Sequence, residues 1–500
     1  MQIKRIGLVV FLWFPVLCLC GLTRGQGLTT NTAFSAPSMA AGFAFDRFPL
    51  TLVSGERTEA VGPLFYEETN AESHTLAFPP FYSSYEEPGV EAQEKQFLYP
   101  LWNWEVYGGE WRWQFAEILS GAGGLEPNED KTRRFTLFPF YFQQRSEDSN
   151  KNYTAVAPFY GHLRNRLFRD RIDFVMFPFY SETQRKDVVT DNYFYPFVDV
   201  RRGDGMKGWQ VWPFVGSEHK VVTMQTNGFG DVTLNGGHDQ FFCMWPFWLS
   251  QDNGLGTTDP AKFRASIPLF VKERSPLRDQ TSVLWPLFTW VNERGRKYRE
   301  WEGPWPLVIF ARGEGKTTSR VWPIFSQSHD ATLERDAYLW PLYQYQRLHA
   351  DPLDQQRRSV LFYLYVNVLE RNTATATHRQ RVAVWPFFTW NRDFQGNERL
   401  QVLAPFEVVL PTNRGLLRNW SPLWSVWRSE VNPRAKATNQ SFLWNLYHRQ
   451  TGPGCKKISL LFGLFQYQRG VKEHQTKVFY LTVSKSLPKA PVVPVKAAQQ

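Results

Sequence analysis

Short apolar segments centred on proline recur along the chain, and polar segments rich in glycine, asparagine and aspartate separate them. Each apolar segment has an apolar residue, an aromatic residue, proline and two large apolar residues. The clearest copies carry tryptophan before proline, and they are Trp212-Pro213, Trp245-Pro246, Trp285-Pro286, Trp305-Pro306, Trp322-Pro323, Trp340-Pro341 and Trp385-Pro386. Successive prolines of the motif lie roughly 16 to 23 residues apart, which indicates a repeat architecture.

Three further copies have Phe or Tyr before proline, at Pro139, Pro178 and Pro196, and other copies are degenerate. The degenerate copies lie at Pro63, Pro79, Pro100, Pro158, Pro268, Pro405 and Pro422. Two late copies have Asn445 or Gly463 in place of proline. This substitution indicates that the position requires a small or ladder-breaking residue rather than proline itself.

The repeat predicts an all-β protein. A proline inside every apolar segment would break a helix, whereas Trp, Phe, Tyr and Val favour strands. Polar segments such as the one around Arg294 and Gly295 predict hairpin turns, so neighbouring strands should be antiparallel. We therefore expect a meander of about 20 to 24 strands, each with the motif at its middle. Because proline cannot donate to the ladder, a recurring bulge or a line of missing hydrogen bonds should cross the sheet.

A meander of this length must curl, split or close, and closure into one barrel removes the unpaired edges. A unit of about 19 residues has room for a tilted membrane strand of about 9 to 11 residues and a turn. The sequence thus favours a large closed barrel. The alternative is a soluble multi-sheet or propeller-like β-repeat array, which would suit motif centres that are apolar on both faces, as at Val384, Trp385, Phe387 and Phe388.

The N-terminus predicts export. Basic residues at Lys4 and Arg5 precede an apolar run from Ile6 to Cys20, as in a secretory signal peptide. The expected organisation is a signal peptide over 1–25, a flexible segment over 26–44, a β-repeat domain over 45–485 and a disordered Pro/Ala/Lys tail over 486–500.

Together, the export signal and the aromatic-rich antiparallel strands from about Phe48 to Val483 resemble bacterial outer-membrane β-barrel proteins at the level of architecture. The resemblance implies insertion among outer-membrane lipids and a structural or transport role in the cell envelope. The alternative function is a soluble exported β-repeat module, periplasmic or extracellular, that binds protein or glycan.

Charge and cysteine content further narrow the class of protein to which the chain can belong. The formal net charge is +10, but basic and acidic residues are interleaved, which argues against a nucleic-acid partner. Only Cys243 and Cys455 remain after removal of the signal, so a disulfide-dense scaffold is excluded and their pairing stays open.

No catalytic motif stands out, so we expect a non-catalytic protein without a metal or a cofactor. The nine histidines are scattered without ligand spacing. Gly313 to Thr317 resembles the end of a phosphate-binding loop, but a strand pattern follows, so a hairpin turn is the better interpretation. The fixed place of tryptophan in each unit favours core or interface packing over ligand binding.

Overall fold

The computed structural model describes residues 41, 44–124, 131–226, 232–470 and 474–486. The predicted signal peptide (1–25), most of the predicted flexible segment (26–44) and nearly all of the predicted tail (486–500) lie outside the described residues.

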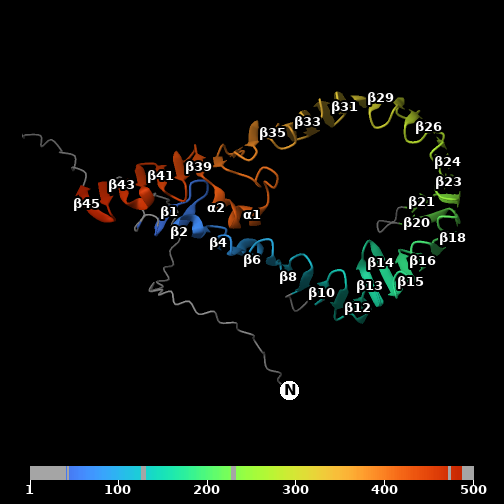
Figure 1. Cartoon of the computed structure of the whole chain (residues 1–500), viewed down its shortest axis with the longest axis horizontal. Coiled ribbons are helices and arrows are strands. Elements are labelled where there is room, and N and C mark those ends of the chain that lie inside the picture. Colours follow the sequence, from blue (N-terminus) through green and yellow to red (C-terminus); the bar gives the residue numbers. More distant parts are fainter. Residues whose placement is uncertain (1–40, 42–43, 125–130, 227–231, 471–473, 487–500) are drawn as a thin grey trace, which may run out of the picture. The chain divides into compact units, whose positions relative to one another are not determined.

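The fold is all-β, and the predicted antiparallel meander is confirmed (Figure 1). One sheet contains 43 strands, and each strand between β1 and β45 pairs with the strand before it and the strand after it in this sheet. Two further strands, β20 (Thr223–Thr226) and β21 (Val232–Asn235), form a separate hairpin between β19 and β22. The expected number of 20 to 24 strands is wrong, because each repeat unit contains two strands rather than one.

The strands have four to eight residues each. The first group is β1 (Asp46–Pro49), β2 (Gly55–Ala60), β3 (Phe65–Asn70), β4 (His74–Phe78), β5 (Tyr82–Glu87), β6 (Ala92–Phe97), β7 (Trp102–Tyr107), β8 (Glu110–Phe115), β9 (Leu119–Gly124), β10 (Arg133–Leu137), β11 (Tyr141–Arg145), β12 (Tyr153–Val156), β13 (Tyr160–Arg166), β14 (Arg169–Val175) and β15 (Tyr180–Arg185). The second group is β16 (Val188–Tyr193), β17 (Val198–Gly203), β18 (Met206–Val211), β19 (Val215–Lys220), β22 (Gly237–Cys243), β23 (Trp248–Leu255), β24 (Ala261–Ser266), β25 (Phe270–Arg274), β26 (Arg278–Val283), β27 (Phe288–Glu293), β28 (Tyr298–Glu302), β29 (Val308–Gly313) and β30 (Lys316–Val321). The third group is β31 (Phe325–Asp330), β32 (Leu333–Tyr338), β33 (Tyr343–Ala350), β34 (Leu353–Val360), β35 (Tyr365–Asn372), β36 (Thr377–Val384), β37 (Phe388–Arg392), β38 (Glu398–Val402), β39 (Trp427–Asn432), β40 (Ala437–Phe442), β41 (Tyr447–Gly452), β42 (Cys455–Leu460), β43 (Phe465–Arg469), β44 (His474–Val478) and β45 (Leu481–Ser486).

The aromatic-proline motif lies in turns, not in the middle of strands. β18 ends at Val211 and β19 begins at Val215, so Trp212, Pro213 and Phe214 form the turn between them. The predicted line of missing hydrogen bonds is therefore wrong: a proline in a turn has no ladder bond to lose. The prediction took each apolar run for one strand, but the run contains the apolar end of one strand, a turn, and the apolar start of the next strand.

With exceptions such as 116–118, every second turn carries the motif or a degenerate copy of it, and in an antiparallel meander alternate turns lie at the same edge of the sheet. We call this edge the aromatic edge. Its turns are 61–64, 79–81, 98–101, 116–118, 138–140, 157–159, 176–179, 194–197, 212–214, 244–247, 267–269, 284–287, 303–307, 322–324, 339–342, 361–364, 385–387, 443–446, 461–464 and 479–480. The opposite, polar edge carries turns such as Arg294–Lys297 and Glu314-Gly315, where the predicted hairpins are confirmed.

The two late copies without proline adopt a different backbone. Asn445 and Gly463 have φ angles of 67° and 94°, in the left-handed region that asparagine and glycine tolerate best. Asn445 and Gly463 therefore do not replace proline within the same type of turn. Proline, with φ fixed near −65°, cannot adopt their conformation.

An insertion of residues 403–426 replaces one turn of the aromatic edge between β38 and β39. It contains the helices α1 (Arg414–Asn419) and α2 (Ser421–Trp424) and the degenerate copies at Pro405 and Pro422. The Asn413 side chain caps α1 by accepting a hydrogen bond from the Leu416 N–H at 2.8 Å. α1 packs against β4 and β5, as Figure 1 shows, although they lie more than 300 residues earlier in the chain.

The sheet is one layer thick over most of its length, since its elements chiefly contact their neighbours in sequence. The buried residues accordingly form small clusters. One contains Tyr153, Ala155, Leu163 and Phe174. Many other buried side chains are small or polar, as at Ser181, Ser282 and Thr289. This layout leaves the large apolar side chains of the turns outside any core.

Candidate functional site: the aromatic edge and the hollow beside it

The aromatic edge is a row of turns with almost no charged residues, interrupted by the insertion 403–426. Glu117 is the one Asp, Glu, Lys or Arg residue in the turns named above. Large side chains at the turn tips are exposed to solvent; Phe214 and Phe247, for example, are each 57% exposed. Contiguous exposed apolar surface on this scale marks a site of interaction.

Backbone hydrogen bonds connect neighbouring turns of this edge. The Trp245 N–H donates to the Pro213 carbonyl at 2.6 Å, and the Trp340 N–H donates to the Pro323 carbonyl at 2.7 Å. Within a turn, the Phe214 N–H donates to the Val211 carbonyl at 2.8 Å. The hydrogen-bond ladder of the sheet thus extends through the turns and pairs these backbone donors.

Aromatic rings of successive turns also lie against one another. The ring centroids of Trp212 and Trp245 are 5.8 Å apart, and those of Trp322 and Trp340 are 5.5 Å apart. Such tilted pairs contribute roughly 0.5–1.5 kcal/mol beyond the area that they bury. The edge is therefore an ordered surface rather than a set of independent loops.

The structure brings all the sequence-predicted motif residues to this edge. The tryptophans 212, 245, 285, 305, 322, 340 and 385 and the prolines 213, 246, 286, 306, 323, 341 and 386 lie in its turns. Trp245, Trp285, Trp305, Trp322, Trp340 and Trp385 are exposed and Trp212 is half-buried, so none forms the centre of a core. Their common place in the unit was visible in the sequence; their exposure was not.

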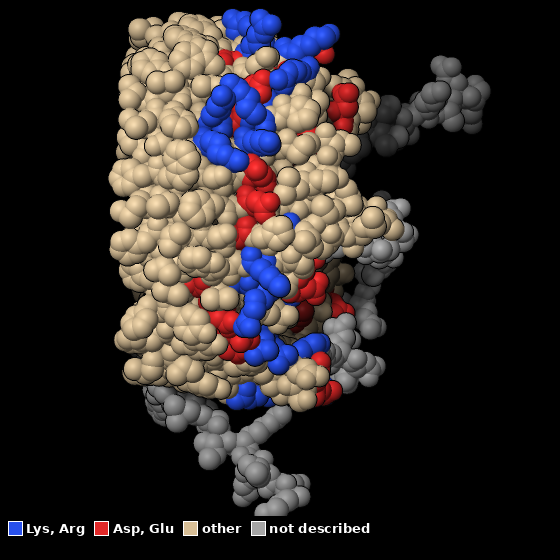
Figure 2. Space-filling view, turned by 90° about the vertical axis from the view of Figure 1, so that its right-hand side faces the viewer, with Lys and Arg blue, Asp and Glu red and all other residues tan. Residues whose placement is uncertain are grey.

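Charged side chains are kept away from the aromatic edge. Figure 2 views the side on which β18 to β24 lie, and its charged residues gather in a band along the middle, leaving one whole side of the view uncharged. Elsewhere in the sheet, charged side chains lie on both faces of the strands. Arg357 and Arg358 are adjacent in the middle of β34, so they point to opposite faces, and both are exposed.

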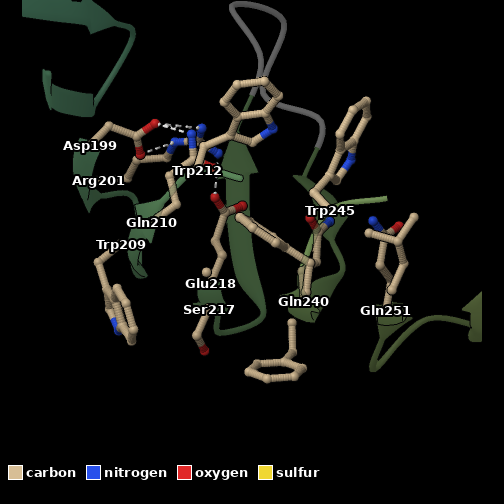
Figure 3. A pocket seen from close by; sticks show the side chains of 14 residues that line it. Asp199, Arg201, Trp209, Gln210, Trp212, Ser217, Glu218, Gln240, Trp245 and Gln251 are labelled. Carbon is tan, nitrogen blue, oxygen red and sulfur yellow. Dashed lines mark hydrogen bonds and ion pairs between the residues drawn. The ribbon is translucent and has the colours of Figure 1, made fainter. Parts of the chain in front are cut away.

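A hollow of about 210 Å³ adjoins the aromatic edge at β17, β18, β19, β22 and β23. Figure 3 shows Trp212 and Trp245 beside the polar side chains, while Trp209 and Ser217 extend away from them. Two rows of cross-strand partners, of which all but Gly208 line the hollow, run across these strands. The row nearer the turns is Asp199, Gln210, Gly216, Phe242 and Leu249, and the next row is Arg201, Gly208, Glu218, Gln240 and Gln251.

Arg201 connects the two carboxylates of the hollow. Its Nε lies 3.1 Å from Asp199 Oδ1, and its Nη1 donates to Glu218 Oε2 at 2.8 Å. Burial raises the pKa of Asp199 and outweighs the opposing effect of Arg201. Desolvation opposes the charge of Arg201, yet Asp199 and Glu218 together raise its pKa, so the guanidinium keeps its charge. His238 Nε2 lies 2.6 Å from Glu218 Oε1.

A second polar cluster joins the two ends of the sheet; we call it the end contact. Lys457 of β42 forms an ion pair with Asp46 of β1, and His448 Nδ1 lies 3.3 Å from the same carboxylate. All three side chains are buried. In the helical insertion, the Asn419 side chain donates to Gln96 Oε1 at 2.8 Å. Side-chain contacts, not strand pairing, thus hold the first strands against the last ones.

Glu59 of β2 is the most strongly perturbed carboxylate of the end contact. Burial alone would raise its pKa, but Arg57, Arg428 and a hydrogen bond from Asn445 lower it to about 2. The Arg57 Nε donates to Glu59 Oε1 at 2.7 Å. This network stabilises the ionised carboxylate where water is excluded.

Neither polar cluster has a local signal in the sequence. Asp46 and Lys457 are 411 residues apart in the chain, and the carboxylates Asp199 and Glu218 meet only through the register of three strands. Gly208 and Gly216, in the middle of strands, were the available sign, because glycine there often marks close approach by another group.

Within the described ranges, no group of three or more His, Cys, Asp or Glu residues could hold a metal ion. The thiols of Cys243 and Cys455 are free. Among the same residues, no helix has the length and apolar character needed to cross a membrane.

Comparison with protein-family models and with curated proteins gave no match to this chain.

Proposed function

We propose that the protein attaches to a lipid bilayer through its aromatic edge and acts as a non-catalytic structural component of the cell envelope, most simply at the outer membrane. The observation that carries this proposal is the row of turns that have exposed aromatic tips and, apart from Glu117, no charged residue. Trp and Tyr favour the boundary between lipid and water, and Phe and Leu favour the acyl region just below it.

The energetics support such attachment. Transfer of one large apolar side chain from water is worth roughly 1.5–3 kcal/mol, so a few inserted turns suffice for stable binding. Unpaired backbone groups oppose entry into lipid. The hydrogen bonds between neighbouring turns, such as Trp245 N–H to Pro213, remove that cost for the donors that they pair.

Attachment by the edge fits the strands better than a closed barrel that spans the membrane. A tilted membrane strand has about 9 to 11 residues, whereas the strands here have four to eight. A spanning barrel also needs an outward apolar band about 25 Å tall. Exposed charges on both faces, as at Arg357 and Arg358, interrupt any such band.

Flotation with lipid vesicles tests the proposal. The exported protein, purified without detergent, is mixed with vesicles of phosphatidylethanolamine and phosphatidylglycerol and centrifuged through a density gradient. We expect it to float with the vesicles and to stay bound in 1 M salt, because the contact is apolar. Recovery of all the protein in the lipid-free fraction would overturn the proposal.

The second candidate function, a soluble exported module that binds glycan, is favoured by one specific observation. The hollow beside Trp212 and Trp245 combines aromatic rings with buried polar groups.

A further inference from the structure

The geometry of the hollow points to a binding site for a neutral saccharide, seated against Trp212 and Trp245 and hydrogen-bonded to Asp199 and the neighbouring amide side chains. This inference does not rest on attachment to lipid. Its basis is the chemistry of β17, β18, β19, β22 and β23.

The two tryptophans supply the apolar part of the site. Their ring planes are inclined by 49° with centroids 5.8 Å apart, so they form two walls that meet at an angle. One face of a pyranose ring presents C–H groups and stacks on an indole, as other apolar groups do. Figure 3 shows both indoles beside the polar side chains of the hollow.

Asp199 supplies a buried acceptor. It is 5% exposed, and its Oδ1 accepts no hydrogen bond from any residue that the structure describes, although Arg201 Nε lies 3.1 Å away. Gln210 donates to the other carboxylate oxygen. A buried acceptor without a hydrogen bond costs free energy. A sugar hydroxyl can donate that bond once the carboxylate turns toward the hollow that Asp199 lines.

The neighbouring strands supply further polar groups for hydroxyls. Gln240 and Gln251 are cross-strand partners that line the hollow, and each amide group both donates and accepts. Gly208 lies between Arg201 and Glu218 in the same row. Because it has no side chain, Glu218 lies over its Cα and turns its carboxylate to Arg201.

The charge of the site favours a neutral ligand. Arg201 pairs with both Asp199 and Glu218, so an incoming cation would have to compete with a fixed guanidinium, and an anion would meet two carboxylates. The same arrangement favours binding over hydrolysis. Glycosidases keep a gap between their two carboxyl groups for the scissile bond, and here Arg201 connects the two.

A second pair of turns offers a matched comparison. Trp322 and Trp340 have nearly the same geometry, with centroids 5.5 Å apart and planes inclined by 46°. The residues that correspond to Asp199 and Gln210 there are Ile309 and Arg320, and Ser326 and Ala337 follow them in the same row. This pair has the aromatic walls without the carboxylate, so it should not bind the sugar.

The saccharide could be a free oligosaccharide or the headgroup of a glycolipid, because the hollow adjoins the aromatic edge. Calorimetric titration of the detergent-free protein with cellotetraose and with chitotetraose tests the first source. Vesicles with and without a galactosyl diacylglycerol, compared by binding of the same protein, test the second. The titration contains no lipid, so its result is independent of the flotation experiment.

We expect a dissociation constant of roughly 0.1–1 mM for one oligosaccharide or a clear preference for glycolipid vesicles, as suits a shallow site with few contacts. Trp245→Ala and Asp199→Asn should each weaken binding at least about tenfold. Trp322→Ala should leave it unchanged. Circular dichroism and the melting temperature confirm that each variant is folded.

Three results would overturn the inference. The first is absence of binding to both oligosaccharides at 10 mM together with equal binding to the two kinds of vesicle. The second is an equal loss in Trp245→Ala and Trp322→Ala, which would indicate general aromatic adsorption. The third is full affinity in folded Asp199→Asn. If the unmodified protein releases reducing sugar and Asp199→Asn does not, the site hydrolyses the saccharide rather than only binding it.

Discussion

The backbone N–H of Trp245 donates to the carbonyl oxygen of Pro213 at 2.6 Å, which joins two turns of the aromatic edge. The two residues belong to successive copies of the motif, and a hairpin at the polar edge separates them. Repetition of this kind of contact, as between Trp340 and Pro323, aligns the uncharged turns in one row. The proposed attachment to lipid depends on that alignment.

Removal of apolar character from the turn tips should weaken attachment to vesicles. Phe214 and Phe247 are exposed tips of neighbouring turns. In Phe214→Glu/Phe247→Glu we expect the partition coefficient between vesicles and water to fall by at least about 100-fold. The reason is that each lost phenyl contact is worth about 1.5–3 kcal/mol. Flotation or surface plasmon resonance on a lipid layer measures this change.

Phe168 is the matched control, since it is 99% exposed but lies in a turn of the polar edge. Phe168→Glu should bind vesicles like the unmodified protein. If Phe168→Glu loses as much binding as the double variant, any exposed phenylalanine contributes to lipid binding and the aromatic edge has no special role.

Substitution of Gly161 should destabilise the small cluster around Phe174. A Cβ at position 161 would lie 2.3 Å from the Phe174 ring and 2.6 Å from the Ala155 Cβ. Gly161→Ala should therefore lower the unfolding free energy by roughly 1–3 kcal/mol, as overpacking does, seen as a lower urea midpoint. Gly124→Ala, at the end of β9 with no atom within 4 Å of its added Cβ, should change the midpoint little. Similar midpoints for the two variants would count against the packing described around Gly161.

The ion pair between Asp46 and Lys457 should hold the ends of the sheet together. Lys457→Met leaves a buried carboxylate that has His448 as its remaining basic neighbour, and such a loss costs roughly 3–5 kcal/mol. Hydrogen exchange should then increase at β1 and at β41 to β43. The double variant Asp46→Asn/Lys457→Met should recover much of the protection, whereas additive losses in the two single variants would refute the pairing.

Acid should weaken the end contact through Glu59. Its pKa in the folded protein is about 2, below the unfolded value of about 4.3, so the ionised carboxylate stabilises the fold. This contribution, about 3 kcal/mol, is fully present above pH 5 and is lost as the pH falls toward 2. Glu59→Gln should be less stable than the unmodified protein at pH 7, and the difference should shrink at pH 2.

Denaturant midpoints between pH 2 and pH 7 measure the effect of Glu59. Glu56→Gln is the control on the same strand, because the Arg47–Glu56 pair is exposed and contributes little. A constant difference between Glu59→Gln and the unmodified protein over the whole range would contradict the assigned role.

The sequence was sufficient for the all-β class, the antiparallel pairing and the hairpin at Arg294–Lys297, because β propensity and turn chemistry are local. It was not sufficient for the place of the motif. Val211, Trp212, Phe214 and Val215 form one apolar run, and no local feature separates the strand ends from the turn between them. This ambiguity halved the expected number of strands.

The candidate sites depended on information that a single unit lacks. The exposure of Trp245 follows from a one-layer sheet without a second layer to cover its turns. The meeting of Asp199 with Arg201 and Glu218 depends on register, since a slip of one residue would turn each side chain to the other face.

Depth measurement with spin labels tests the central proposal most directly. Single cysteines at positions 214, 247 and 387 of the aromatic edge, 168 and 296 of the polar edge, and 327 in the middle of β31 are labelled in a Cys243→Ser/Cys455→Ser background on lipid vesicles. We predict that oxygen accessibility places the first three labels below the lipid headgroups and the other three in water. Burial of the label at 327 at the centre of the bilayer would contradict attachment by the edge and favour a membrane-spanning sheet, and six labels in water would contradict attachment altogether.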